Sequence, residues 1–316
     1  MNRFLKTFLF FLLPLMVLSV LADKLLTLGL RHSGKGDFAV WNDVFDGKVD
    51  ADIVVYGSSR AWRHFDPKIM EDSLGCRVYN LGMDGYNFYM EYQRGKVFLR
   101  HNRRPKVIIL SLDYTSLDTM RYLYNPEQFL GYLDDSIVGP ATRAYEGLAW
   151  YDYVLPLVRY AGYRHAIGLS AEALLTPSRN GKDRYKGFAC ADQEWNDDLA
   201  KAEARYGRLT AGVDSNNLGL FRQFIHETRA AGIGLVLVFP PVYKEGQDFV
   251  VNGKDVIGLY RRLAGREGVP FLDYTGDSLC ARKTFFYNGE HMNCAGETLF
   301  TNDIVRQMRL MGLWHP

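Results

Sequence analysis

The stretch DIVVYGSSR, residues 52–60, decides the fold class. Its first half is a near-continuous apolar run rich in β-branched residues, which is typical of a strand buried on both faces of a sheet. The glycine that follows permits a sharp turn, and the serines after it are common at the start of a helix. The stretch therefore predicts the strand-to-helix turn of an α/β sheet.

Further apolar runs of the same kind alternate with stretches of helical period. The runs lie at 76–82, 106–113, 233–241 and 270–274, and the helical stretches at 61–74, 89–101, 216–231, 256–267 and 295–311. This alternation predicts an α/β fold with a parallel five-stranded sheet flanked by helices. The stretch from about 116 to 215 breaks the rhythm, so we expect a large, mainly helical insertion after the third strand.

Composition excludes several classes of protein. The chain has 316 residues, of which 47% are hydrophobic and 23% are charged, so it is neither disordered nor fibrous. With 38 Lys and Arg against 36 Asp and Glu, the net charge of +2 gives no general reason to bind nucleic acid. Glycine-rich phosphate loops are absent, which disfavours nucleotide chemistry. The residues Glu290, His291 and Cys294 have no second ligand pair, so no metal and no other cofactor is expected.

The amino terminus has the pattern of a signal sequence. Arg3 and Lys6 precede an uncharged apolar run from residue 7 to 22. A cleaved signal peptide is one interpretation, with a small-residue site before Asp23. An uncleaved signal anchor is the other, and the continuing apolar residues 25–30 favour it. Because positive residues stay inside, both interpretations place the rest of the chain outside the cytoplasm. We expect a transmembrane anchor at 1–30 and one domain at 31–316, with the insertion at about 116–215.

The four cysteines are too few and too scattered for a disulfide scaffold. They are Cys76, Cys190, Cys280 and Cys294. One pair can form in an oxidising compartment, and Cys280 with Cys294 is the nearest pair in sequence, but sequence alone leaves the connectivity open.

Candidate chemistry lies at the predicted carboxyl ends of the strands, where ligands and catalytic groups gather in such sheets. After the first strand, Ser58 or Ser59 would lie beside the N–H groups of a helix start, either as a nucleophile or as an ordinary cap. After the second strand, a glycine N–H of YNLGMDG, 79–85, can face the same place as half of an oxyanion hole, or can serve a plain turn. His291 lies in a loop that this topology returns to the same edge.

These motifs resemble the SGNH or GDSL hydrolase superfamily. GSSR at 57–60, YNLGMDG at 79–85 and a terminal block with His291 followed by asparagine and glycine appear in the family's order and spacing. The similarity covers about residues 51–311. It is nearest to the membrane-anchored extracytoplasmic branch that includes the teichoic-acid D-alanine transfer protein and the alginate and peptidoglycan O-acetyltransferase relatives. The resemblance implies a flavodoxin-like three-layer fold.

The resemblance also implies roles for individual residues. Ser59 aligns with the nucleophile and Ser58 with the aspartate that precedes it in the family. His291 aligns with the general base, and the N–H groups of Ser59 and Gly82 align with the oxyanion hole. Physically, the imidazole would take the Ser59 proton as the hydroxyl oxygen attacks an ester carbonyl.

Two positions depart from the family pattern. Asn288 stands where the family has an acid, and in a serine protease Asp to Asn costs about 10⁴ in kcat. An amide oxygen can still hold the imidazole, so a Ser-His dyad supported by Asn288 is one possibility, and a carboxylate from Glu290, Asp273 or Asp277 is another. After the third strand, the family's oxyanion asparagine is missing from SLDY, 111–114.

From these observations we expect an extracytoplasmic acyltransferase or esterase, with acetyl as the leading acyl group, acting on a cell-surface polysaccharide through an acyl-serine intermediate. The resemblance implies a multi-pass membrane O-acyltransferase as partner, since acetyl-CoA is cytoplasmic. The departures at Asn288 and after the third strand motivate an alternative, a catalytically degenerate scaffold or binding protein of a membrane O-acylation complex. A third alternative is a secreted carbohydrate esterase that needs no partner.

Overall fold

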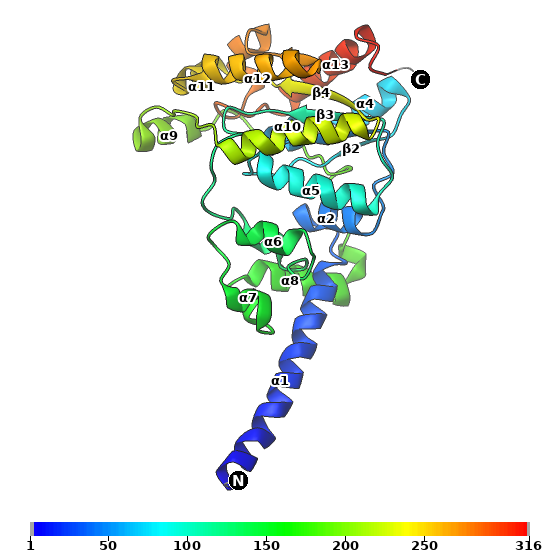
Figure 1. The fold of residues 1–316 in the computed structure, drawn as a ribbon, viewed down its shortest axis with the longest axis vertical. Coiled ribbons are helices and arrows are strands. Elements are labelled where there is room, and N and C mark those ends of the chain that lie inside the picture. Colours follow the sequence, from blue (N-terminus) through cyan, green and yellow to red (C-terminus); the bar gives the residue numbers. More distant parts are fainter. Residues whose placement is uncertain (1–2, 315–316) are drawn as a thin grey trace. The chain divides into compact units, whose positions relative to one another are not determined.

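A computed structural model describes residues 3–314 and contains a five-stranded parallel sheet flanked by helices (Figure 1). The strand order is β2-β1-β3-β4-β5, which is the flavodoxin-like order. The predicted fold class is therefore confirmed. The strands are β1 (Ile53–Tyr56), β2 (Val78–Asn80), β3 (Val107–Ser111), β4 (Gly234–Phe239) and β5 (Phe271–Asp273).

The helices of at least five residues include the predicted ones, with one correction. They are α1 (Arg3–Leu30), α2 (Gly36–Phe45), α3 (Ser59–His64), α4 (Pro67–Leu74), α5 (Phe88–His101), α6 (Val138–Arg143), α7 (Trp150–Val154), α8 (Arg164–Leu175), α9 (Asp198–Tyr206), α10 (Ser215–Ala230), α11 (Lys244–Phe249), α12 (Gly253–Glu267) and α13 (Cys294–Leu310). The prediction of a single helix over 61–74 is wrong. The chain breaks between α3 and α4 because the Asp66 carboxylate caps a new helix at the Lys68 N–H, 2.7 Å away, and Pro67 lacks the N–H that a continuous helix needs.

Alternate strand residues pack against different helices. Ile53 and Val55 of β1 belong to an apolar core cluster that also holds residues of α3, α4 and α13. On the opposite face of the same strand, the Tyr56 ring contacts Phe98 of α5 and Phe224 of α10. Both faces of the sheet are thus buried, which is why its strands read as continuous apolar runs.

The chain divides into two compact units. Unit 1 contains the residues as far as Asp43 together with Arg121–Asp183, and unit 2 contains Val44–Met120 and the residues from Arg184 onward. The stretch that interrupts the sheet pattern is therefore shared. Its first part, with α6, α7 and α8, belongs with α1, and its last part, with α9, belongs with the sheet.

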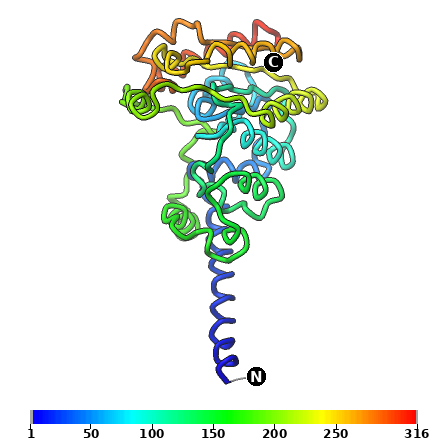
Figure 2. Tube along the Cα trace, turned by 60° about the vertical axis from the view of Figure 1, so that its left-hand side comes forward, coloured from blue at the N-terminus to red at the C-terminus, as the bar shows by residue number. Residues whose placement is uncertain are grey.

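Unit 1 is built along the C-terminal part of α1 (Figure 2). The helix packs closely on α8, where a side chain at Gly29 would collide with Ser170. The Thr27 and Tyr160 hydroxyl groups lie 2.6 Å apart. Toward its other end α1 is exposed and apolar, and a window of 18 residues has a mean hydropathy of 2.3. Within residues 3–314 it is the one helix long and apolar enough to cross a membrane.

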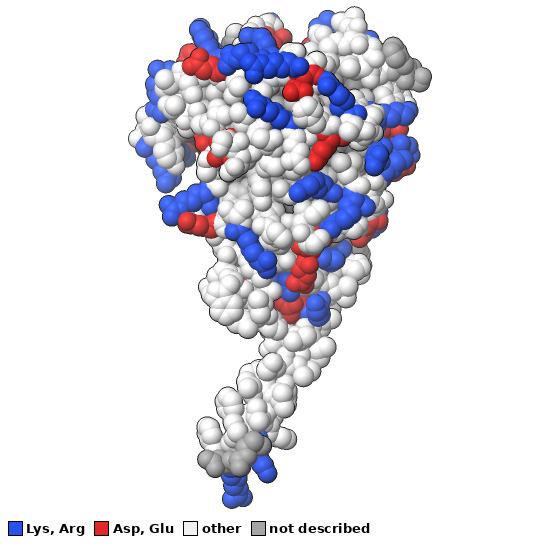
Figure 3. Space-filling model, in the orientation of Figure 1, with Lys and Arg blue, Asp and Glu red and all other residues white. Residues whose placement is uncertain are grey.

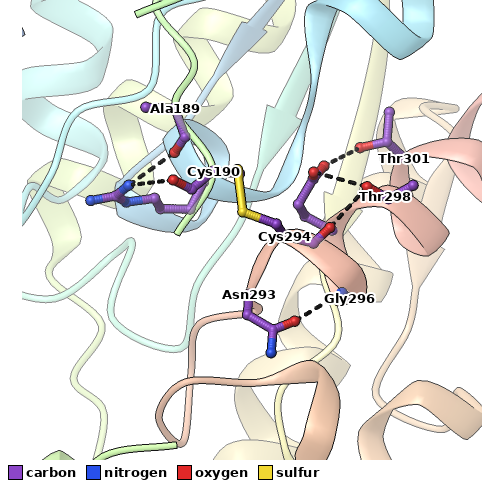
Figure 4. The surroundings of a disulfide bond; sticks show 9 residues. Ala189, Cys190, Asn293, Cys294, Gly296, Thr298 and Thr301 are labelled. Atoms are coloured by element: carbon purple, nitrogen blue, oxygen red, sulfur yellow. Dashed lines mark hydrogen bonds between the residues drawn. A yellow bond between two sulfur atoms is a disulfide. The ribbon is translucent and has the colours of Figure 1, made fainter. Parts of the chain in front are cut away.

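A disulfide bond between Cys190 and Cys294 lies within unit 2 (Figure 4). Cys294 begins α13, directly after Asn293, whose Oδ1 caps the helix by accepting the Gly296 N–H at 3.1 Å. Cys190 lies in the chain segment that leads toward α9. Cys76 and Cys280 are free thiols, so no disulfide forms between Cys280 and Cys294, the pair nearest in sequence. The bond joins two segments separated by 104 residues.

We expect the double substitution Cys190→Ser with Cys294→Ser to lower the free energy of unfolding by about 4 to 5 kcal/mol, because a cross-link over a long loop restricts the unfolded chain. Urea unfolding of the full chain in detergent measures the effect, and reduction of the wild type should reproduce it. Cys76→Ser, which removes a thiol outside the bond, serves as the control. Equal unfolding midpoints for the double variant and the wild type would contradict the expectation.

Candidate active site

A polar cavity of about 360 Å³ opens at the carboxyl ends of the strands in unit 2. Segments that follow β1, β2, β3 and β4 all contribute to its wall. Because β1 and β3 are neighbours from which the chain continues in opposite directions, this is the point where ligands bind in sheets of this order. Its lining is formed by Ser58, Ser59, Arg60, Gly85, Tyr86, Asn87, Asp113, Tyr114, Thr115, Asp118, Thr119, Met120, Val242 and Glu290.

The two serines after β1 have different environments. Gly57 has a φ of 138°, and a side chain there would collide with Ser111 and Ala61, so the sharp turn requires glycine. Ser58 is the N-cap of α3, and its hydroxyl donates to the Asp113 carboxylate. Ser59 is the first residue of the helix. The cap is therefore Ser58, and the Ser59 hydroxyl is left for other partners.

Ser59, His291 and Asn288 lie in one hydrogen-bonded row. His291 Nε2 is 2.8 Å from Ser59 Oγ, and His291 Nδ1 is 3.0 Å from Asn288 Oδ1. The Asn288 oxygen also accepts the backbone N–H groups of Glu290 and His291, at 3.0 and 2.9 Å. An atom that accepts N–H bonds is an oxygen, so the histidine Nδ1 must carry the proton. The Nε2 lone pair then points to Ser59 Oγ, which is the arrangement that a general base needs.

The Asp198 carboxylate is connected to this row by a hydrogen bond from the Asn288 amide. Asn288 Nδ2 donates to Asp198 Oδ2 at 3.3 Å, and Asn196 Nδ2 donates to the same oxygen at 2.9 Å. Asp198 is the first residue of α9, which lies about 90 positions before Asn288 and carries no motif that sequence reasoning could recognise. Asp198 favours the amide orientation that presents Oδ1 to the imidazole.

The other carboxylates that the sequence offered have different positions. Asp273 accepts hydrogen bonds from Arg261 and Thr275, and Asp277 caps a short helical turn through the Leu279 N–H. Glu290 lines the polar cavity. His291 Nδ1 has Asn288 as its partner instead.

His291 is held in its neutral form. Burial and the nearby positive charge of Arg60 lower the pKa of His291 to about 4, against the opposing effect of Asp113. The ring stacks on Tyr287, with centroids 5.4 Å apart. At neutral pH the imidazole is thus free to accept a proton.

The helix that carries Ser59 also anchors the histidine loop. His64, at the end of α3, accepts the Met292 N–H through Nε2 at 2.9 Å. Burial and the neighbouring His291 and Arg60 lower the pKa of His64 well below its usual value, so His64 remains an acceptor. Asn80 fixes the same end of α3 through the carbonyl groups of Ala61 and Phe65.

The second predicted oxyanion donor has another partner. The Gly82 N–H donates to Asn80 Oδ1 at 2.9 Å, and a side chain at this position would collide with the Trp62 backbone. Gly82 therefore packs closely against α3, and its role in an oxyanion hole stays a prediction. The Ser59 N–H lies in the first turn of α3, where N–H groups have no partner within the helix.

A buried ion pair that sequence reasoning missed joins the strand ends. The Arg60 Nε donates to the Asp113 carboxylate, and its two terminal nitrogens donate to the carbonyl groups of Leu112 and Pro240. The guanidinium carbon lies 4.5 Å above the centre of the Phe239 ring. Arg60 therefore connects the segments after β1, β3 and β4. The signals in the sequence were the arginine of GSSR and the aspartate of SLDY.

A second cavity, of about 180 Å³, touches the same histidine loop. Leu199 and Ala202 of α9 and Phe249 of α11 form its apolar part, next to His291. Within residues 3–314, no three His, Cys, Asp or Glu side chains are grouped as metal ligands would be.

No protein-family model matches the chain, and no curated protein matches it in sequence. Solved structures with a similar course of the chain include an acetyl xylan esterase, AlAXEase, at 11% identity and a TM-score of 0.44, covering 81% of this chain and 98% of the esterase. A protein described as lipolytic and of the G-D-S-L family, from Desulfitobacterium hafniense DCB-2, has 10% identity and a TM-score of 0.38, covering 80% and 97%. A protein described as an acylhydrolase, from Bacteroides fragilis NCTC 9343, has 12% identity and a TM-score of 0.39, covering 82% and 86%.

We expect Arg60→Met to lower the free energy of unfolding by about 3 to 5 kcal/mol, because Asp113 is then left as a buried charge without its partner. Arg77→Met is the matched control. Arg77, with half of its side chain exposed, pairs with the exposed Asp50, and its second partner Asp52 is also bound by Arg103, so the loss of Arg77 should cost less than about 1 kcal/mol. Denaturant unfolding of the full chain in detergent measures both. Equal losses for the two variants would contradict the assigned role of Arg60.

Proposed function

We propose that this chain is a serine-dependent acyl-transfer enzyme of the SGNH type. The observation that carries the proposal is the row Ser59–His291–Asn288 beside a polar cavity, with the imidazole in the proton-accepting tautomer. A hydroxyl, a neutral imidazole and an oriented hydrogen-bond acceptor behind it form the constellation that activates a serine.

In the proposed reaction, Ser59 Oγ attacks the carbonyl carbon of an ester and its proton passes to His291 Nε2. The Ser59 N–H stabilises the negative oxygen that develops. The tetrahedral intermediate collapses to an acyl-Ser59 enzyme, and His291 returns the proton to the leaving alcohol. A water molecule or a second hydroxyl group then attacks the acyl enzyme and releases an acid or a new ester.

We infer that the acceptor or donor alcohol belongs to a cell-surface glycan and that the acyl group is small, with acetyl as the first choice. Hydroxyl and carboxylate groups of Thr115, Asp118 and Thr119 line the cavity and can bind sugar hydroxyl groups. Arg60, the cavity residue with a positive charge, is already paired with Asp113. This charge distribution suits a neutral glycan better than a polyanionic one.

A location outside the cytoplasm has two supports. α1 is long and apolar enough to anchor the chain in a membrane, with Arg3 and Lys6 at its start. The bond between Cys190 and Cys294 is of a kind that persists in oxidising compartments. Because activated acyl donors are made in the cytoplasm, an enzyme placed there would need a membrane O-acyltransferase as partner when it works as a transferase.

The first test uses a fluorophosphonate probe on the full chain in detergent. Covalent labelling of the wild type is expected, and Ser59→Ala should abolish it because the nucleophile is lost. Ser58→Ala is the matched control within the same motif and should retain labelling, since the Ser58 hydroxyl caps the helix and binds Asp113. Absence of labelling in the wild type, or labelling that survives in Ser59→Ala, would favour the degenerate scaffold. Acetate release or transfer on glycans then separates hydrolysis from transfer.

The second test measures how the labelling rate depends on pH. Since the pKa of His291 is lowered to about 4, the imidazole should remain a base from neutral pH down to that value, and the rate should fall as pH decreases through about 4. An ordinary histidine would give a midpoint near its reference pKa of about 6.5. Circular dichroism at each pH must show that the fold persists.

A paired substitution probes Asn288 in the same experiment. Asn288→Asp combined with Asp198→Asn exchanges the two side chains and places the carboxylate beside the His291 Nδ1–H. The midpoint should rise by about 1 to 3 pH units, because a close negative charge favours the imidazolium. Asp198→Asn alone should shift it slightly downward, since the Asp198 charge raises the pKa of His291. An unchanged midpoint in the exchanged variant would contradict the assigned contact.

A further inference from the structure

The helix α1 changes character at Asp23. Before this residue the side chains of α1 are mostly exposed and apolar. The Asp23 carboxylate is buried and receives two hydrogen bonds from the Arg159 guanidinium, at 3.0 and 2.7 Å, and one from the Leu157 N–H at 3.0 Å. From this point on, one side of the helix packs against other residues of unit 1, while Leu25 and Leu28 on its other side are exposed.

Unit 1 carries a second exposed apolar surface, on and directly after α7. We call it the α7 surface, and it consists of Trp150, Tyr151, Val154 and Leu155. Trp150 is 70% exposed and Val154 67%, which is unusual for such large apolar residues in a folded unit. In Figure 3 the surface at the position of α7 shows neither basic nor acidic side chains. An apolar patch of this kind marks an interaction site.

The α7 surface is level with the end of the apolar run of α1. Val20 of α1 lines one cavity, of about 180 Å³, together with Val154 and Leu155, and Asp23 and Lys24 border it as well. The uncharged run of α1, residues 7–22, spans about 24 Å at 1.5 Å per residue, most of the roughly 30 Å hydrocarbon thickness of a bilayer. If these residues cross the membrane, Val20 lies where the hydrocarbon meets the headgroups, and so does the α7 surface.

We propose that the α7 surface is inserted in the headgroup layer of the membrane that α1 spans. Trp and Tyr are enriched at this depth because one part of the ring is apolar and the other forms hydrogen bonds. The lipid interface covers the patch without any protein partner, and together with the Asp23–Arg159 pair it fixes unit 1 against the membrane. The inference rests on the proposed membrane anchoring of α1.

The test uses the full chain in lipid nanodiscs. Phospholipids brominated near the headgroup or near the chain end quench tryptophan fluorescence at their own depth. The difference between the wild type and Trp150→Phe isolates the signal of Trp150 from that of the other tryptophans. We expect the lipids brominated near the headgroup to reduce this signal by about half, and those brominated near the chain end to reduce it much less.

Tyr124→Trp in the Trp150→Phe background is the matched control. Tyr124 is also exposed and belongs to unit 1, but it adjoins Asn125, which lies 3.4 Å from Asp37 in α2, beyond the end of α1. Its indole should not be quenched by either lipid.

These measurements distinguish failure of the membrane insertion of the α7 surface from failure of the membrane anchoring by α1. Release of the wild-type chain from vesicles by alkaline carbonate would overturn both, since α1 would not span the membrane. A chain that stays in the membrane while the Trp150 signal is unquenched by both lipids would overturn the insertion of the α7 surface alone. Protection of Trp150 from aqueous acrylamide without quenching by brominated lipids would show that protein covers the surface, and would overturn it too.

Discussion

The buried pair of Arg60 and Asp113 is the interaction on which the rest of the site depends. A charge removed from water is tolerated only when partners replace the water, and here every partner comes from the carboxyl end of a strand or the segment after it. The pair therefore fixes the segments after β1, β3 and β4 relative to one another. Asp113 also accepts the hydroxyl of Ser58, the residue that caps the helix of Ser59. One ion pair thus connects the wall of the cavity to the start of the helix that carries Ser59.

The histidine side of the site is positioned by contacts of another kind. His64 at the end of α3 and the disulfide at the start of α13 hold the loop of His291 from its two sides. Cys294 is bonded to the segment that continues into α9, the helix of Asp198. The insertion that interrupts the sheet pattern is thereby linked to the row of Asn288 and His291. An asparagine at position 288 is consistent with this arrangement, because Asp198, the next residue in the hydrogen-bonded row, carries the negative charge and orients the amide.

The sequence predicted the sheet well because each strand is buried on both faces and therefore reads as a continuous apolar run with a glycine or polar residue at its end. The order of strands and helices also predicted that Ser59 and His291 lie at the same carboxyl edge of the sheet, because the topology decides where the strand ends meet. Contacts between segments distant in the sequence could not be predicted in this way. The pairing of Cys190 with Cys294 and the reach of Asp198 depend on how irregular chain between 184 and 198 is folded, and no periodicity describes such a segment. The break before Pro67, by contrast, was readable from Asp66 and Pro67 themselves.

The lowered pKa of His291 makes its imidazole a weak base. A weakly basic imidazole accepts the serine proton less readily than an ordinary one, so the attack on an ester is not favoured by basicity. The Arg60 guanidinium that lowers the pKa of His291 lines the same cavity and donates to Asp113, Pro240 and Leu112. Its field opposes the imidazolium, and in the proposed reaction the same field would favour a nearby oxyanion. Asn288, in place of a carboxylate, likewise leaves the His291 imidazole without a directly bonded negative charge that would raise its pKa. In the proposed reaction, stabilisation of the oxyanion would then matter more than the strength of the base.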